Sequence, residues 1–461
     1  MNTYDLVVVG GGAGGLTAAR EATRRGARTM LVSDGPLGGD CTHTGCVPSK
    51  ALLSAASAGR SFADAMDDVR RHIDTIAATE DADVLTGEGV EVLRGRAGLT
   101  GGGGLDVDGE RIDGRRIILA TGSRAKVPPV PGIDTVEYLT NESVFSLVTQ
   151  PQRLAILGGG PIGVELAQAF ADLGTTVTLV EAAQRLLPRE EPEASETIAR
   201  TLGRRGVDVR VGRGVDRVTG DGDGRICLHL ADDSADSAIV ADELLVAAGR
   251  TPVTEGLSPD TAGVDLDERG HIRTDDTLAT TASGIWAIGD VTGRMPFTHA
   301  AGRMAVVAVA NALAGRARLR SAHFDPAAIP WVTFTDPEVG RVGIAEADAA
   351  DRGGRVAFLP FDELDRGIVS GATDGFVKLI AGPRRLLGNA GGGKLLGATI
   401  VGPRAGEMVG EVALAMHTNM FTGRLAQATH AYPTWSMAIQ EAAAQYFMTY
   451  GGRTARAARA D

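Results

Sequence analysis

The chain has 461 residues, of which 43% are hydrophobic and 23% charged, and its formal net charge is -12. This composition is ordinary for a soluble globular protein, and the length suggests about three domains. The negative charge argues against a nucleic-acid or anionic-membrane partner. No basic segment precedes an apolar run, and no apolar run reaches the roughly 18 residues of a membrane span, so we expect a cytoplasmic protein.

The first predicted elements form a strand–turn–helix–strand unit. Residues 6–9 are four consecutive apolar residues, which favours a buried strand, and a helical stretch over residues 16–22 precedes a second strand at 29–32. The turn before the helix carries glycines in GxGxxG spacing, namely Gly10, Gly12 and Gly15. In this context the spacing predicts a dinucleotide site, because free N–H groups at the helix N-terminus attract a pyrophosphate.

The end of the second strand should supply an acidic residue for a ribose hydroxyl. Ser33 occupies that place and Asp34 follows it. We therefore assign the ribose contact to Asp34, beside Ser33.

Two of the three cysteines, Cys41 and Cys46, lie five positions apart in the segment 38–50, which reads GGDCTHTGCVPSK. The spacing is too wide for a CxxC motif, but one helical turn can bring the two sulfurs to disulfide distance. Such a pair serves either electron chemistry or a structural staple, and in a cytoplasmic chain the first is more common. His43, between the two cysteines, is either a local base or an exposed turn residue.

The strand–turn–helix–strand pattern returns about 150 residues later. Residues 154–157 predict a strand, 164–173 a helix and 176–180 a second strand. The turn again has GxGxxG spacing, with Gly158, Gly160 and Gly163. Two such units in one chain predict two dinucleotide sites.

Glu181 ends the second strand of this later unit, and no basic residue follows before Arg185. A carboxylate at this position accepts the ribose 2′-OH of NADH and repels the 2′-phosphate of NADPH. The sequence therefore predicts a preference for NADH.

Three further buried strands are predicted at residues 116–122, 243–250 and 284–290, and a helix at 299–313. After about residue 324 the pattern changes to antiparallel strands followed by helices, which indicates an α+β domain. Its strands are expected at 332–334, 356–358, 376–380 and 396–400, and its helices at 407–416 and 437–447. The Ala- and Arg-rich tail over residues 451–461 is expected to be frayed.

The order of these motifs resembles the class I pyridine nucleotide–disulfide oxidoreductases, which include dihydrolipoamide dehydrogenase and mercuric reductase. The resemblance covers essentially the whole chain. It is carried by GG-x-C-x4-C-V-P-S-K, the two GxGxxG units, Ala120-Thr121-Gly122, Ala248-Gly249-Arg250-Thr251-Pro252 and Ala287-Ile288-Gly289-Asp290.

The resemblance implies an α/β fold with two Rossmann-like domains, for FAD and for NAD(P)H, and a C-terminal α+β dimerisation domain. It implies a first FAD-binding part at residues 1–148, the NAD(P)H domain at 149–270, a second FAD-binding or central part at 271–324 and the dimerisation domain at 325–461. It also implies a homodimer whose active site is completed by the partner subunit.

The resemblance further assigns roles to individual residues. Cys46 would be the thiolate beside the flavin, and Cys41 the exposed thiol that attacks the substrate. Lys50 would pair with Glu165 near the flavin, and Asp290 would hold FAD, with the helix that starts near His299 pointing at the flavin. The remaining residues implied to bind the cofactors are Gly39, Lys50, Thr121, Gly122, Gly249, Arg250, Gly289 and Ala300, and no metal ligand is implied.

The chain departs from the family near its C-terminus. Disulfide reductases carry His-Pro-Thr there, with a Glu five residues after the His, and the His moves a proton to the leaving thiol. Tyr432 stands in the place of the His and Met437 in that of the Glu, while His430 lies two residues early. A phenol titrates at about pH 10 and an imidazole at about pH 6.5, so the phenol is the poorer shuttle at neutral pH.

Three functions remain open from the sequence. The first is an FAD enzyme that uses NADH to reduce a Cys41–Cys46 disulfide and passes electrons to, or takes them from, a disulfide or dithiol substrate. The second uses the same flavin and dithiol to reduce mercuric or other metal ions, or quinones, without a His–Glu shuttle. The third is a non-enzymatic flavoprotein subunit of a larger complex.

Overall fold

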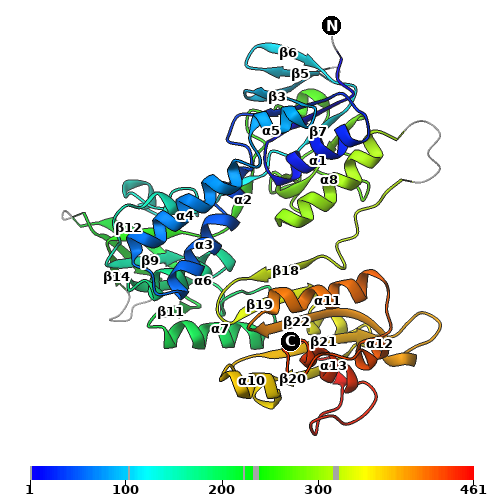
Figure 1. The fold of residues 1–461 in the computed structure, drawn as a ribbon. Helices are drawn as coiled ribbons and strands as arrows, with labels where there is room; N and C mark the ends of the chain where they lie inside the picture. Colours follow the sequence, from blue (N-terminus) through cyan, green and yellow to red (C-terminus); the bar gives the residue numbers. More distant parts are fainter. Residues whose placement is uncertain (1–2, 102–103, 222–223, 232–237, 315–320, 461) are drawn as a thin grey trace. The chain divides into compact units, whose positions relative to one another are not determined.

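The structure is a computed structural model that describes residues 3–101, 104–221, 224–231, 238–314 and 321–460. The chain forms two compact units (Figure 1). Because contacts join segments that are distant in sequence, the units cut across the four predicted segments, whose bounds stay a prediction. The first unit comprises Met1–Pro128, Leu139–Gln150 and Val246–Asp325, and the second Pro129–Tyr138, Pro151–Leu245 and Pro326–Asp461.

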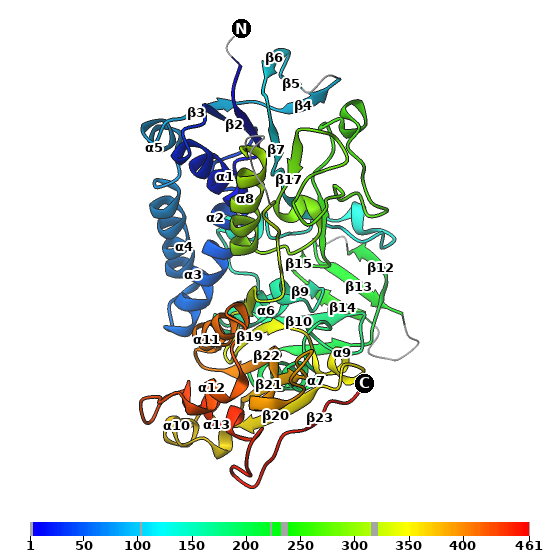
Figure 2. The same ribbon diagram turned by 90° about the vertical axis from the view of Figure 1, so that its right-hand side faces the viewer.

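A five-stranded parallel sheet is the centre of the first unit. All four residues of its middle strand, Leu-Val-Val-Val, are buried, as expected when both faces of a parallel sheet are covered. Helices α1 and α8 lie side by side against it (Figures 1 and 2). In sheet order the strands are β17 (Ile285–Ala287), β7 (Ile117–Leu119), β1 (Leu6–Val9), β2 (Thr29–Ser33) and β3 (Val90–Arg94), and the helices are α1 (Ala13–Arg24) and α8 (Thr298–Ala312).

The opposite face of this sheet is covered by a small antiparallel sheet. Val7 and Val9 of β1 share one buried cluster with Leu99, Leu105 and Ile112 of the small sheet. The other elements of the first unit are β4 (Ala97–Thr100), β5 (Gly104–Val107), β6 (Glu110–Asp113), the pair β8 (Ser123–Ala125) and β16 (Arg250–Pro252), α2 (Gly39–His43), α3 (Cys46–Ser57), α4 (Phe62–Ala77) and α5 (Ala82–Gly87).

The second unit begins with another βαβ arrangement. Parallel strands β9 and β10 are joined through α6, as the second glycine motif predicts. A three-stranded antiparallel sheet follows. The bounds are β9 (Arg153–Leu157), β10 (Thr176–Glu181), β11 (Asp208–Val211), β15 (Glu243–Val246), α6 (Pro161–Asp172), α7 (Pro192–Arg204), β12 (Val215–Gly220), β13 (Ile226–Leu230) and β14 (Ala238–Ala241).

A six-stranded antiparallel sheet forms the C-terminal part of the second unit, as the α+β pattern predicts. Helices α11 and α13 pack on one face of it (Figure 2). In sheet order the strands are β18 (Pro330–Thr333), β19 (Glu338–Gly343), β22 (Lys394–Gly402), β21 (Phe376–Gly382), β20 (Arg355–Pro360) and β23 (Arg456–Ala457), and the helices are α9 (Glu346–Ala350), α10 (Asp365–Ser370), α11 (Ala405–His417), α12 (Thr422–Gln427) and α13 (Met437–Ala444).

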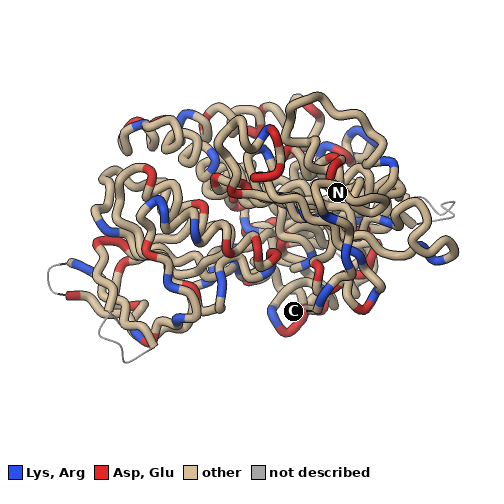
Figure 3. Tube along the Cα trace, turned by 90° about the horizontal axis from the view of Figure 1, so that it is seen from below, with Lys and Arg blue, Asp and Glu red and all other residues tan. Residues whose placement is uncertain are grey.

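The tail departs from the expectation of a frayed end. Arg456 and Ala457 pair with Val356 and Arg355 of β20, so the tail adds a strand to the sheet. Residue 461 lies outside the described residues. Figure 3 shows acidic and basic residues interspersed along the chain, so the net charge of -12 is not gathered in one segment.

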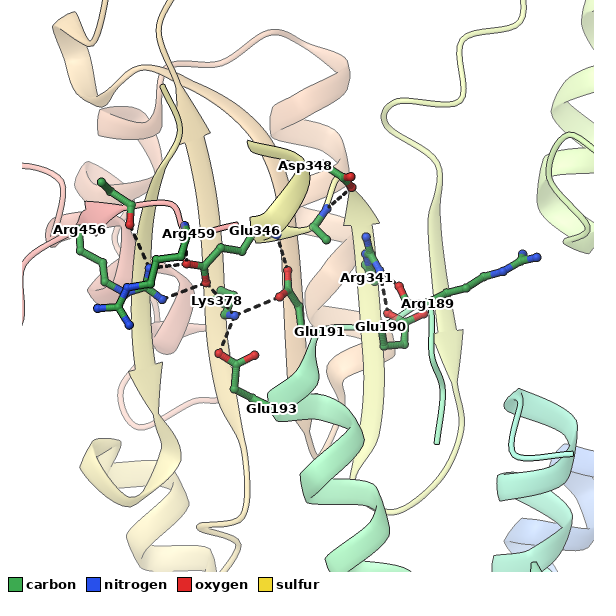
Figure 4. Close-up of polar contacts among 12 residues, drawn as sticks. Arg189, Glu190, Glu191, Glu193, Arg341, Glu346, Asp348, Lys378, Arg456 and Arg459 are labelled. Atoms are coloured by element: carbon green, nitrogen blue, oxygen red, sulfur yellow. Dashed lines mark hydrogen bonds and ion pairs between the residues drawn. The ribbon is translucent and has the colours of Figure 1, made fainter. Parts of the chain in front are cut away.

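A buried lysine on β21, Lys378, is the centre of an ion cluster in the second unit (Figure 4). Its side chain is 1% exposed, and Nζ donates to Glu191 at 3.1 Å, to Glu193 at 2.6 Å and to Glu346 at 3.0 Å. Both terminal nitrogens of the Arg456 guanidinium also donate to Glu346. We call these five residues the Lys378 cluster.

Strand alternation explains why Lys378 is buried. Val377 and Leu379 point to the face that α11 and α13 cover, so Lys378 points to the other face, beside Ile380, which packs on Ala349 of α9. An ammonium group loses its water there, and the surrounding carboxylates compensate for that loss.

Acid should weaken this cluster, because the pKa of Glu346 is shifted. Burial alone would raise the pKa, but the bonds from Arg456 and Lys378 outweigh burial and lower it to about 2. An unfolded Glu titrates at about pH 4.3, so the stabilisation is complete above that pH and is lost as the pH falls towards about 2. We expect the free energy of unfolding of Glu346→Gln to lie below that of the wild type at about pH 6, with a difference that shrinks as the pH is lowered.

Urea unfolding at a series of pH values measures this difference. Glu110→Gln, at an exposed position on β6, is the control and should show no such trend. A difference for Glu346→Gln that stays constant from pH 6 to the acid limit would contradict the assignment.

Candidate active site

The two predicted redox cysteines lie together in the first unit. Cys41 is in α2, Cys46 is the first residue of α3, and both are free thiols. The Thr298 hydroxyl lies 3.0 Å from the sulfur of Cys41 and 3.6 Å from that of Cys46. Cys46 is exposed and Cys41 is half-buried, and the assignment of Cys41 as the thiol that attacks the substrate stays a prediction.

The sulfurs also interact with each other. A hydrogen bond with Cys46 raises the pKa of the Cys41 thiol, burial raises it further, and the bond from Thr298 lowers it. A thiolate on Cys41 is therefore disfavoured, and the two thiols titrate as one coupled pair. This shift favours the predicted role of Cys46 as the thiolate.

Both glycine-rich turns have the geometry that a bound dinucleotide requires. A Cβ on Gly15 would overlap the carbonyl oxygen of Gly10, and one on Gly163 would overlap that of Gly158, so each helix packs against its turn only through glycine. A Cβ on Gly160 would meet no described atom within 4 Å, which leaves that turn open to a ligand. The turns therefore fit two pyrophosphates, one before α1 and one before α6.

The dithiol segment starts on the first of these turns. The Gly38 N–H donates to the carbonyl oxygen of Gly11 at 2.9 Å, and a Cβ on Gly39 would lie 2.8 Å from the Cα of Gly12. Gly39 has a φ of 60°, in the left-handed region. Only glycine allows the dithiol segment to approach the predicted pyrophosphate turn so closely.

The residues predicted to bind ribose stand at the strand ends. Ser33 is the last residue of β2 and is buried, and Asp34 follows it and is exposed. Glu181 ends β10, and its two carboxylate oxygens accept the N–H groups of Gly159 at 2.6 Å and Ala183 at 2.7 Å. Glu181 therefore also fixes the glycine turn beside it.

Arg250 joins the dithiol segment to the predicted FAD ligand Asp290. Its guanidinium is paired with Asp40, the neighbour of Cys41, and Nε donates to the Ser123 hydroxyl at 2.7 Å. That hydroxyl donates to Asp290 at 2.6 Å, and the Arg250 Nε also lies 3.7 Å from the same carboxylate. Two carboxylates thus share one guanidinium beside the sulfurs.

The other predicted FAD residues surround this network. The Thr121 hydroxyl donates to the Val253 carbonyl oxygen at 2.6 Å. The Val253 N–H donates to the Gly122 carbonyl oxygen at 3.0 Å. The Gly249 carbonyl accepts the N–H of Lys126 at 3.0 Å. These bonds join the segments that follow β7 and β15.

Helix α8 starts at Thr298, one residue before its predicted start. His299 is exposed and stacks on Phe297, with ring centroids 5.8 Å apart, while Ala300 is fully buried. The Gly289 N–H points at the sulfur of Met304, 3.2 Å away, which holds the Gly-Asp turn against the helix.

Lys50 and Glu165 belong to different units, so their pairing stays a prediction. Lys50 is half-buried on α3, one turn beyond Cys46. Glu165 on α6 is 4% exposed and accepts the backbone N–H of Phe334 at 2.8 Å.

The two candidate proton donors differ in their surroundings. Tyr432 is 69% exposed, and its hydroxyl donates to Asp365 at 3.0 Å, a bond that raises the pKa of the phenol. His430 is turned inwards: Nε2 lies 3.0 Å from a carboxylate oxygen of Glu411 and Nδ1 lies 3.1 Å from the carbonyl oxygen of Ala428. Both nitrogens of His430 therefore face acceptors within the chain, whereas the Tyr432 side chain is accessible.

Met437, predicted to stand in the place of the family's Glu, packs against the core of the second unit. His43 is half-buried at the end of α2, and its Nε2 lies 2.8 Å from the Leu37 carbonyl oxygen, so neither of its two predicted roles is tested. Cys227, the third cysteine, is half-buried on β13.

Sequence reasoning missed several residues of the site. Thr298 lies next to the predicted His299, and Asp40 lies next to Cys41. Their position beside residues of the motifs was the one signal in the sequence that could have identified them. Ser123, Asp365 and Glu411 stand in no motif, and only long-range contacts reveal them.

Two kinds of feature are absent from the described residues. In that part of the chain, no group of three or more His, Cys, Asp or Glu side chains is placed to hold a metal ion. No described helix combines the length and apolar character that crossing a membrane requires.

Comparison with known proteins places this site in a family context. Residues 4–305 match the family model described as pyridine nucleotide-disulphide oxidoreductase, and residues 329–443 match that of its dimerisation domain. The chain is 36% identical to a dihydrolipoyl dehydrogenase of Chlorobaculum tepidum, over 97% of this chain and 98% of that protein. It is 32% identical to a mercuric reductase of Bacillus cereus, over 95% of this chain and 70% of that protein. Among solved structures, the Cu(II) complex of the HOCl-induced flavoprotein disulfide reductase RclA from Escherichia coli is similar, with a TM-score of 0.85, 31% identity and coverage of 96% and 99%.

The Thr298 hydroxyl should control the reactivity of the dithiol. Thr298→Val removes the bond to both sulfurs and keeps the shape of the side chain, so a thiolate loses a donor and the thiol pKa rises. We expect alkylation of the reduced protein by iodoacetamide at pH 7 to slow by about fivefold. Thr75→Val, on an exposed turn of α4, is the matched control, and equal rates for both variants would contradict the assignment.

Proposed function

We propose, from the premise that the chain belongs to the pyridine nucleotide-disulphide oxidoreductase family, that it carries electrons from NADH through FAD and the Cys41–Cys46 pair to a disulfide substrate. Membership of the family makes the chain an FAD- and NAD(P)H-dependent oxidoreductase. The preference for NADH, the roles of the two cysteines and the acceptor are the proposed parts. The contact of Thr298 Oγ1 with both sulfurs is the observation that supports a working cysteine pair, and Glu181 at the end of β10 is the one that supports NADH.

The proposed relay moves two electrons. The turn of Gly10, Gly12 and Gly15 would hold FAD, which would supply two electrons from NADH to the Cys41–Cys46 disulfide. The S–S bond would then break and, with two protons taken up, give two sulfhydryls. In the oxidative half, Cys41 attacks one sulfur of the substrate disulfide, the substrate S–S bond breaks, and a mixed disulfide forms. Cys46 then attacks Cys41 and restores the internal disulfide. Each thiolate that leaves the substrate takes up one proton.

The second candidate is a metal-ion reductase. It is favoured by one observation: the exposed side chain at the family's proton-donor place is the Tyr432 phenol, while the His430 nitrogens are engaged within the chain. A two-electron reduction of Hg(II), or a one-electron reduction of each of two Cu(II) ions, needs no proton on a leaving thiol. Two similar proteins also support a metal-ion reductase, because one is a mercuric reductase and the other is a flavoprotein disulfide reductase whose structure is a Cu(II) complex.

The assembly is the remaining part of the proposal. The chain carries the family's dimerisation domain over residues 329–443. We propose a cytoplasmic homodimer in which the segment around Tyr432 completes the dithiol site of the partner. The exposure of Tyr432 supports this, because a proton donor for another subunit must be accessible.

The nucleotide preference can be tested at Glu181. We expect kcat/KM for NADH to exceed that for NADPH by about tenfold or more, because the carboxylate repels a 2′-phosphate. Glu181→Ser should bring the ratio close to one. Asp34→Ala is the control: it should weaken retention of FAD and leave the ratio unchanged. A wild-type ratio in favour of NADPH would refute the assignment.

The acceptor and its proton donor can be tested together. The protein is reduced anaerobically with NADH and then offered lipoamide, glutathione disulfide, Hg(II), Cu(II) or a quinone. We expect reoxidation by a disulfide, and Tyr432→Phe should slow it by about a hundredfold, the usual contribution of a general acid. The same variant should leave reduction of metal ions within about twofold, because no proton is required there.

Three results would change this assignment. Reoxidation by metal ions alone favours the second candidate. A large loss with disulfides in His430→Ala, and none in Tyr432→Phe, makes His430 the proton donor. Full activity of Cys46→Ser with every acceptor excludes both dithiol functions. Turnover by the purified chain alone, in contrast, leaves the assignment unchanged and argues against a non-enzymatic subunit of a larger complex.

A further inference from the structure

We infer that the Lys378 cluster and the neighbouring Arg341–Glu190 pair position the glycine turn that binds the pyridine nucleotide, so that Lys378 and Trp331 are positioning residues for NADH. The inference rests on the proposed function, because it takes the Gly158–Gly163 turn as the NADH site. All of the residues involved lie in the second unit.

The first link is between the glycine turn and the segment after β10. The Gly159 N–H donates to Glu181 at 2.6 Å, and the Gly159 carbonyl accepts the N–H of Leu187 at 2.9 Å. Leu186 is 1% exposed, and its side chain lies against Gly159 so closely that no Cβ would fit there. The segment 181–187 therefore holds Gly159 by both backbone groups and by packing.

The second link is a turn that needs support. Leu187 has a φ of 46°, a left-handed conformation that is unfavourable for a residue with a branched side chain. The Glu190 N–H donates to the Leu187 carbonyl at 2.8 Å and closes the turn. A strained turn keeps its shape only when the residues around it are fixed.

The third link fixes Glu190 to the C-terminal sheet. The Trp331 Nε1–H of β18 donates to Glu190 at 2.8 Å. Arg341 of β19 pairs with the same carboxylate at 3.5 Å and donates to the carbonyl oxygen of Arg189. Both Glu190 and Arg341 are about 7% exposed, so this is a buried charge pair.

The fourth link is Glu191, the residue before α7 (Figure 4). One of its carboxylate oxygens accepts the backbone N–H of Glu346 at 2.7 Å, and the other accepts from Lys378 at 3.1 Å. Lys378 also holds Glu193 in the first turn of the same helix. The start of α7 is thus bound to the sheet by a charge that has no water around it.

These four links make one continuous series of contacts from Gly159 to Lys378. If the ammonium is removed, three carboxylates lose their common partner and the segment 187–193 loses its anchor. The glycine turn would then shift or become mobile, and binding of the nucleotide would weaken. The two cysteines belong to the first unit, and neither takes part in these links.

Two variants test this inference, each with a matched control. Lys378→Met removes the buried charge, and Arg453→Met removes the charge of an exposed ion pair with Glu363. Trp331→Phe removes only the indole N–H bond to Glu190, and Trp286→Phe makes the same change where the indole nitrogen has no hydrogen-bond partner among the described residues.

We expect the KM for NADH to rise about tenfold in Lys378→Met and about threefold in Trp331→Phe, with kcat and the KM for the acceptor within about twofold of the wild type. Both controls should keep the wild-type KM. Amide hydrogen exchange over residues 157–163 should be faster in Trp331→Phe than in Trp286→Phe, a readout that does not depend on turnover.

If Lys378→Met does not fold, Trp331→Phe decides. An unchanged KM for NADH together with unchanged exchange over residues 157–163 overturns the inference. An equal rise of both KM values also overturns it, because the effect is then not specific to the nucleotide turn. Failure of the proposed function is a different result: the wild-type protein itself would then not be reduced by NADH.

Discussion

Close contact between a glycine-rich turn and the helix that follows it is the constraint on which both nucleotide sites depend. At Gly15 and Gly163 a side chain would strike the carbonyl oxygen of the first glycine of its turn, so the helix N-terminus can come near a pyrophosphate only with glycine there. In the first unit this turn also carries the start of the dithiol segment, through Gly11 and Gly38. In the second it is bound by the segment that leads to the Lys378 cluster. The same type of glycine turn is therefore contacted by the dithiol segment in the first unit and by the segment 181–187 in the second.

Local pattern was sufficient for the parts of the site that are themselves local. The two βαβ units, the cysteine pair and the start of α8 follow from glycine spacing and apolar runs, because the chemistry and the backbone conformation are encoded by neighbouring residues. Lys378 shows the limit of prediction from local pattern. The run Phe-Val-Lys-Leu-Ile predicts a strand, but the burial of its lysine depends on carboxylates nearly 190 residues and about 30 residues earlier in the chain. The paired tail also depends on long-range packing, because Arg456 and Ala457 pair with β20, about 100 residues earlier.

The proton chemistry shows the same division. The sequence predicts that Tyr432 stands in the place of an imidazole, but not that Asp365 accepts its hydroxyl proton or that His430 lies between Glu411 and a backbone carbonyl. The carboxylate beside Tyr432 raises the pKa of the phenol and makes it a weaker acid.

The connectivity of the two units constrains how this protein can be made. The chain passes between them five times, at residues 128/129, 138/139, 150/151, 245/246 and 325/326. Neither unit is a continuous segment, and the first cannot be complete until residue 325 has left the ribosome. During synthesis the parallel sheet lacks its edge strand β17 for most of elongation, and the strand β7 that will pair with it stays uncovered. The nascent chain thus carries an open sheet edge for longer than a chain of two consecutive domains would.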